Sequence, residues 1–103
     1  MARLLSILTV CGCGFGSSLI LRMGVEDVLS EEGLEAKVEA WDTGTAKCQK
    51  VDIIACSQDI VPQLEGFEGA IVPVRDITSK EEIRKKLMPV FKKIFDEINA
   101  KKT

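Results

Sequence analysis

Two nearly continuous apolar runs constrain the fold of this chain more than any other feature of its sequence. They are Arg3–Val10 (RLLSILTV) and Val51–Ser57 (VDIIACS). A strand that is apolar on both faces needs other elements to cover both faces, as is typical of strands inside a parallel sheet. The sequence therefore predicts that these two runs are the central strands of such a sheet.

Two further runs are suited to the outside of the same sheet. Ala36–Asp42 (AKVEAWD) alternates apolar residues with Lys37 and Glu39, so one of its faces is polar. Gly69–Arg75 (GAIVPVR) contains Pro73, which has no N–H for a sheet hydrogen bond and therefore favours an edge strand. With the two buried runs in the middle, the predicted strand order is 2-1-3-4.

Helical periodicity separates these strands. After Ser17, apolar residues recur at the helical spacing i, i+4, i+7 and i+8, namely Leu21, Val25, Val28 and Leu29. We expect Ser17 or Ser18 to be the N-cap of this helix and Gly33 to end it. Ser79 and Glu82 form a capping-box pattern before a longer helix. The apolar stripe of the longer helix comprises Ile83, Leu87, Val90, Phe91, Ile94 and Ile98. Strands that alternate with helices predict an α/β fold, a four-stranded parallel sheet flanked by helices and Rossmann-like.

An unusual stretch, VCGCGFGSS, follows the first predicted strand. In an open parallel sheet, ligands bind at the carboxyl ends of the strands where the strand order reverses, and Cys11 is predicted to lie there. Gly12, Gly14 and Gly16 allow a tight turn whose N–H groups, together with the start of the following helix, can surround an anion. We expect these groups to lower the pKa of the Cys11 thiol, which makes Cys11 a nucleophile near neutral pH.

Other residues of this loop distinguish between possible chemistries. Low-molecular-weight tyrosine phosphatases have the pattern C-x(5)-R-[S/T]. This chain has the same spacing, with Ser17 in place of the arginine. It therefore lacks the guanidinium that holds a transferring phosphoryl group in those enzymes. Dinucleotide binding requires G-x-G-x-x-G and a P-loop requires lysine before Ser17, and neither is present. The C-x-C pair is weak evidence for a metal, and we expect none. A phosphoryl carrier is favoured, with a phosphatase-like or arsenate-reducing cysteine enzyme, or a regulatory module without transfer, as alternatives.

The composition excludes several other classes of function. A chain of 103 residues that is 46% apolar fits a single domain, residues 1–103. Fourteen Lys and Arg against sixteen Asp and Glu give a net charge of −2, and aromatic residues are few, so nucleic acid is not an expected partner. Histidine is absent, which excludes Cys–His and Ser–His–Asp catalysis within the chain. No run approaches the ~20 apolar residues of a membrane span, and we expect a reduced, cytoplasmic protein.

The loop and its context resemble the IIB components of the bacterial phosphoenolpyruvate-dependent sugar phosphotransferase system, most closely the ascorbate and galactitol types. The resemblance is carried by VCGCGFGSSLILRM after the first strand and by DIIACS as the third strand. It implies a phosphotransferase in which Cys11 accepts a phosphoryl group from a phosphohistidine of a IIA protein. Cys11 then passes the group to a sugar bound by the membrane IIC transporter, with no cofactor. The absence of histidine agrees with this, since the donor histidine belongs to the partner.

The resemblance also implies which residues bind phosphate. They are Gly12, Cys13, Gly14, Phe15, Gly16, Ser17 and Ser18. A polar residue often stands in this family where the chain has Cys13, and this departure leaves open whether the second thiol is inert or traps Cys11 on oxidation. The implied substrate is ascorbate-like or a polyol, and the implied location is the cytoplasm, in peripheral association with the membrane transporter.

Overall fold

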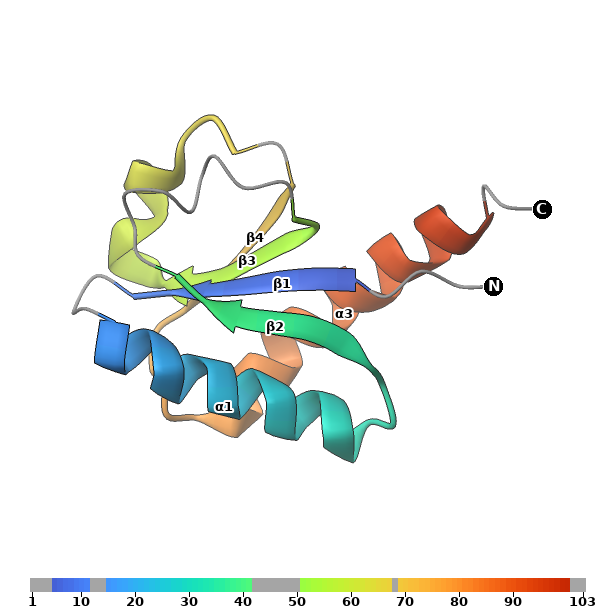
Figure 1. Ribbon diagram of the computed structural model, residues 1–103, viewed down its shortest axis with the longest axis horizontal. Coiled ribbons are helices and arrows are strands. Elements are labelled where there is room, and N and C mark those ends of the chain that lie inside the picture. Colours follow the sequence, from blue (N-terminus) through green and yellow to red (C-terminus); the bar gives the residue numbers. More distant parts are fainter. Residues whose placement is uncertain (1–4, 12–14, 42–50, 68, 101–103) are drawn as a thin grey trace.

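The computed structural model describes residues 5–11, 15–41, 51–67 and 69–100 of the chain. The described residues form four strands and three helices, counting the 3₁₀ helix (Figure 1). In chain order the elements are β1 (Leu5–Val10), α1 (Phe15–Glu31), β2 (Ala36–Ala40), β3 (Ile53–Ser57), the 3₁₀ helix η1 (Gln58–Leu64), β4 (Ala70–Val74) and α3 (Lys80–Ala100). Each strand lies within its predicted range, so the α/β fold class is confirmed.

The four strands form one parallel sheet with the order β2-β1-β3-β4, which confirms the predicted order 2-1-3-4. Ile7 of β1 is paired with Val38 of β2 on one side and with Ile53 of β3 on the other. Pro73 lies in the edge strand β4, opposite Cys56 of β3. An edge strand accepts proline because one of its sides needs no partner for its N–H groups.

Alternate residues of β1 enter two separate apolar cores. Leu5 and Ile7 pack with residues of α1 and α3, whereas Leu8 and Val10 pack with residues of η1. This division follows from the strand period of two, which points successive side chains to opposite faces. Figure 1 shows α1 and α3 on one side of the sheet and η1, drawn in yellow-green, on the other. The apolar character of both faces of β1 is therefore explained.

Helix α1 begins at Phe15, so the expectation that Ser17 or Ser18 is its N-cap is wrong. Both serines lie inside its first turn. A serine cap is worth about 1 kcal/mol, and each hydrogen bond gained by a longer helix contributes about as much. Extending the helix by three or four residues, about one turn, toward Cys11 therefore outweighs the cap.

The carboxyl end of α1 agrees with the prediction. Gly33 follows the helix with a φ of 71°, a conformation that favours glycine. The N–H of Gly33 donates to the carbonyl of Ser30 (3.1 Å), and the N–H of Leu34 donates to that of Leu29 (2.8 Å). This pair of bonds is the Schellman motif, which satisfies the last carbonyls of the helix.

Helix α3 begins with one half of the predicted capping box. The N–H of Glu82 donates to Ser79 Oγ (3.2 Å). The Glu82 carboxylate accepts hydrogen bonds from Lys86 Nζ (2.7 Å) and from the N–H groups of Arg75 (2.6 Å) and Asp76 (2.9 Å). These bonds, with that from Lys86 the largest effect, lower the pKa of Glu82 from 4.5 to about 2. They tie the segment after β4 to the first turn of α3.

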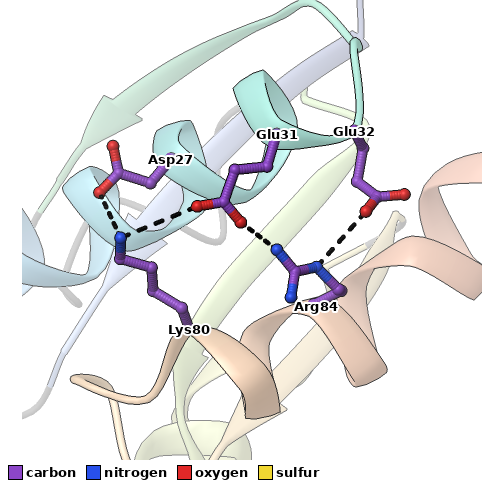
Figure 2. Close-up of polar contacts among 5 residues, drawn as sticks. All are labelled: Asp27, Glu31, Glu32, Lys80 and Arg84. Atoms are coloured by element: carbon purple, nitrogen blue, oxygen red, sulfur yellow. Dashed lines mark hydrogen bonds and ion pairs between the residues drawn. The ribbon is translucent and has the colours of Figure 1, made fainter.

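Ion pairs join the exposed sides of α1 and α3 (Figure 2). Lys80 Nζ lies 3.4 Å from Asp27 and 4.0 Å from Glu31. Arg84 contacts Glu31 and places its Nε 3.4 Å from Glu32. These side chains are between 33% and 55% exposed, so each pair contributes less than about 1 kcal/mol to stability.

Candidate functional site

Cys11 lies where the sequence predicts, directly after the last residue of β1. The sheet order reverses at β1, because β2 lies on one side of this strand and β3 and β4 on the other. In open parallel sheets such a point, at the carboxyl ends of the strands, is where ligands bind. The Cys11 side chain is only 5% exposed. The fold therefore places a nearly buried thiol at the ligand-binding edge of the sheet.

The start of α1 lies at the same end of the sheet. This helix begins at Phe15, four residues after Cys11, and the end of β1 and the start of α1 both lie at the left of Figure 1. The first N–H groups of a helix have no acceptor within the helix, and the helix dipole makes this end positive. Phe15, Gly16 and Ser17 contribute such groups in the first turn of α1. An anion near Cys11 is therefore favoured by the backbone of these residues.

Only part of the predicted loop belongs to the described residues. Gly12, Cys13 and Gly14 lie outside the described residues, and for Ser17 and Ser18 the description covers the backbone alone. The structure thus brings together Cys11 and the first turn of α1, while the nest of amides around the sulfur stays a prediction.

A second thiol lies beside the site, although the sequence indicated only that it belongs to the core. Cys56 is fully buried and is the residue of β3 that pairs with Val10 of β1. Burial, followed by the charges of Asp59 and Cys11, raises the pKa of Cys56 from 9.0 to about 12. Cys56 is therefore a neutral thiol at pH 7 and a poor nucleophile. The signal for this neighbour was its position near the end of the adjacent strand.

The carboxyl edge of the sheet also presents a cation. Arg75 follows β4, is exposed, and lines a hollow of about 540 Å³ together with Asp76 and Lys86. Arg22, the cation closest to the loop along the sequence, pairs with Glu26 at 3.4 Å. Among the ion pairs of the described residues Arg75 takes part in none, although the carboxylates of Asp76 and Glu82 line the same hollow.

The described residues contain neither a candidate metal cluster nor a helix suited to spanning a membrane. Nowhere in residues 5–11, 15–41, 51–67 and 69–100 do three His, Cys, Asp or Glu side chains gather closely enough to hold a metal ion. No helix in this part of the chain has the length and apolar character that crossing a bilayer requires. Cys13, the other thiol of the loop, lies outside the described residues.

Comparison with known proteins gives relatives that are all IIB components of the PTS system. Residues 6–88 match the family model for the lactose/cellobiose-specific IIB subunit of the PTS system. The chain is 33% identical over 89 residues to an ascorbate-specific PTS system EIIB component of Mycoplasma pneumoniae, covering 84% of this chain and 94% of the relative. It is also 33% identical over 94 residues to the component of the same name from Shigella sonnei, covering 88% of this chain and 93% of the relative.

Solved structures share the fold. The lactose-specific IIB component domain of the phosphotransferase system of Streptococcus pneumoniae superposes with a TM-score of 0.59 at 14% identity, covering 87% of this chain and 97% of that chain. The solution structure of an enzyme IIB subunit of the PTS system of Escherichia coli K12 gives a TM-score of 0.50 at 16% identity, over 100% of both chains. At such low identities, these similarities speak for the fold alone.

Proposed function

The chain belongs to the family of IIB subunits of the phosphotransferase system, and from this premise we propose that it is a phosphoryl carrier whose reactive group is Cys11. The phosphoryl group comes from a phosphohistidine of a IIA protein and goes to a sugar bound by a membrane IIC transporter. The observation that carries the proposal is the position of Cys11. It is a nearly buried thiol at the carboxyl end of a central parallel strand, four residues before a helix begins.

The proposed reaction has two displacements at phosphorus. In the first, the Cys11 thiolate attacks, an S–P bond forms, the N–P bond to the donor histidine breaks, and the leaving imidazole takes up a proton from solvent. In the second, a sugar hydroxyl attacks, an O–P bond forms and the S–P bond breaks. This step regenerates the thiolate, and the hydroxyl proton passes to solvent or to a base of the transporter.

The phosphoryl oxygens need donors while they are attached to sulfur. A phosphocysteine carries about two negative charges, by analogy with other phosphorylated side chains. We assign their binding to the loop and first turn that follow Cys11, namely Gly12, Cys13, Gly14, Phe15, Gly16, Ser17 and Ser18. The free N–H groups and the positive end of α1 support this assignment.

The residue at position 17 favours a carrier over a hydrolase. A phosphatase of this geometry holds the transferring group with an arginine, and the chain has Ser17 at that position. Without the guanidinium, attack by water on the phosphocysteine is less strongly assisted, so the phosphoryl group remains on sulfur until a partner accepts it.

The names of the relatives support an ascorbate-like sugar as the substrate, with a polyol as the second choice. The acceptor is bound by a membrane protein, whereas no helix of the described residues is suited to crossing a bilayer. As the family membership implies, we place the carrier on the cytoplasmic side, in peripheral association with IIC and in contact with IIA.

The proposal is tested by phosphotransfer to the purified chain. The reaction contains phosphoenolpyruvate, the general components of the system and an ascorbate-type IIA, and the labelled residue is identified by peptide mass mapping. We expect one phosphoryl group on Cys11, and we expect Cys11→Ser to reduce labelling more than about a hundredfold, since serine is a far weaker nucleophile at neutral pH. Cys56→Ala is the matched control, because it removes the neighbouring thiol and leaves Cys11 in place.

Two results would contradict the proposal. Equal labelling of Cys11→Ser and the parent chain would show that the reactive residue lies elsewhere. Rapid turnover of an aryl phosphate by the parent chain alone would instead identify a phosphatase-like enzyme, the main alternative for a loop with this cysteine spacing.

A further inference from the structure

Three large apolar side chains of α1 are exposed next to the site. Leu19 is 39% exposed, Ile20 is 48% exposed and Met23 is 64% exposed, and we call these three residues the α1 apolar surface. Met23 lies three residues after Ile20 and four after Leu19, so all three belong to neighbouring positions on the helix. Packing against the sheet does not explain them, because the buried face of α1 is formed by other residues, including Leu21 and Val25.

The α1 apolar surface lies within reach of a protein that covers Cys11. Along the helix, Met23 is about 12 Å from Phe15, the first residue of α1. An ordinary interface buries about 800 Å² on each partner, which corresponds to a disc about 16 Å in radius. Because Cys11 is only 5% exposed, a protein that delivers a group to it must make close contact around it. A contact of ordinary size then includes the first two and a half turns of α1, as far as Met23.

The charges at this edge match a phosphorylated protein. Arg75 follows β4, two strands from β1 or about 10 Å away, and takes part in no ion pair among the described residues. The start of α1 adds the positive end of a helix dipole. A phosphohistidine brings about two negative charges to the same edge. Positive charge on this chain and negative charge on the donor are therefore complementary.

We propose that the α1 apolar surface is the docking surface for the protein that delivers the phosphoryl group, with Arg75 contributing a positive charge at the same edge of the sheet as Cys11. This inference rests on the proposed function. The partner is a folded protein that presents a phosphohistidine among apolar side chains. A second copy of this chain does not fit, because it contains no histidine to donate from. An anionic lipid surface fits poorly as well, because the exposed acids Glu26 and Asp27 follow directly along the helix.

The test inserts a charge into the α1 apolar surface. Met23→Lys is compared with Ser30→Lys, because residue 30 is exposed on the same side of α1 two turns farther from the site. Binding of purified, unphosphorylated ascorbate-type IIA is measured by titration calorimetry, and the rate of Cys11 phosphorylation is measured over a range of IIA concentrations. We expect Met23→Lys to raise Kd and KM at least tenfold with little change in kcat, and Ser30→Lys to bind like the parent.

Circular dichroism of both lysine variants checks that they are folded. Ile20→Ser is a second, milder substitution in the α1 apolar surface, and we expect it to weaken IIA binding about threefold or more. The docking proposal is overturned if the parent chain does not bind IIA, or if Met23→Lys and Ser30→Lys bind it equally well. It is also overturned if Met23→Lys abolishes only self-association in sedimentation, or only binding to phosphatidylglycerol vesicles, and leaves IIA binding intact.

The two proposals fail in different ways. Suppose that the parent chain binds IIA and that Met23→Lys weakens this binding, but that Cys11 of the parent chain is not phosphorylated. This result supports the docking surface and refutes the proposed chemistry. Phosphorylation of Cys11 at equal KM in both variants supports the chemistry and refutes the docking surface.

Discussion

The two halves of α1 carry different kinds of residues on their exposed sides. The first half, next to Cys11, exposes the α1 apolar surface, whereas the second half exposes acids such as Asp27 and Glu31 that pair with α3. Both halves bury the same apolar stripe against the sheet. The buried stripe therefore explains why the segment is a helix, and the exposed side separates a half suited to a partner from a half that is joined to the rest of the fold.

The largest effect is expected when two adjacent residues of the first half are compared, one on the buried side of α1 and one on its exposed side. Leu21 is fully buried and Ile20 is 48% exposed. We expect Leu21→Ala to lower the free energy of unfolding by about 2–5 kcal/mol, because it leaves a cavity in the core. Ile20→Ala should cost less than about 1 kcal/mol, because its side chain packs little against the fold. Urea unfolding measures both values, and equal losses would show that the exposed residues serve stability rather than binding.

The arrangement of the sheet and the buried face of α1 could be predicted from the sequence. The central strands could be predicted because their runs are apolar on both faces, and the edge strand because Pro73 lacks an N–H. Strand order and the position of Cys11 then follow from the general behaviour of parallel sheets. The buried face of α1 could be predicted as well, because Leu21, Val25, Val28 and Leu29 recur at helical spacing, and all four are buried. The spacing could not show that the apolar side chains outside this face, Leu19, Ile20 and Met23, are covered by no other element of the fold.

Details that depend on small energies or on distant contacts were missed. The start of α1 at Phe15 rather than at a serine cap reflects a difference of about 1 kcal/mol. Cys56 lies close to Cys11 because of the register between β1 and β3, and no local sequence pattern specifies this register. Glu82 binds the N–H groups of Arg75 and Asp76, which the chain brings to it only after β4 has joined the sheet.

A smaller effect is expected where α3 is joined to the segment after β4. The pKa of Glu82 is about 2 in the folded chain and 4.5 without these contacts, so the folded state favours the ionised carboxylate. The stability that it contributes is fully present above pH 4.5 and is lost as the pH falls from 4.5 toward 2. We expect Glu82→Gln to cost about 1 kcal/mol at pH 7 and to flatten this acid dependence. Urea unfolding at a series of pH values from 7 to 2.5 measures it.

Glu81 supplies a matched control for this change. It is one residue away, 81% exposed, and contacts only Lys85 at 3.9 Å among the described residues. Glu81→Gln should leave both the stability at pH 7 and its acid dependence nearly unchanged. An acid dependence that persists in Glu82→Gln would assign it to other carboxylates.

The smallest effect is expected in the second half of α1, where Glu31 contacts both Lys80 and Arg84 (Figure 2). We expect Glu31→Gln to lower the free energy of unfolding by less than about 1 kcal/mol at low salt, because these exposed charges gain little over their hydrated state. In 1 M NaCl the Debye length is about 3 Å, so the difference from the parent should nearly vanish. Urea unfolding at 0.02 M and 1 M NaCl measures this difference, and IIA binding measured in parallel should not change. If Glu31→Gln weakened IIA binding as much as Met23→Lys does, the docking surface would extend along the whole of α1, and the division of the helix into two halves would be wrong.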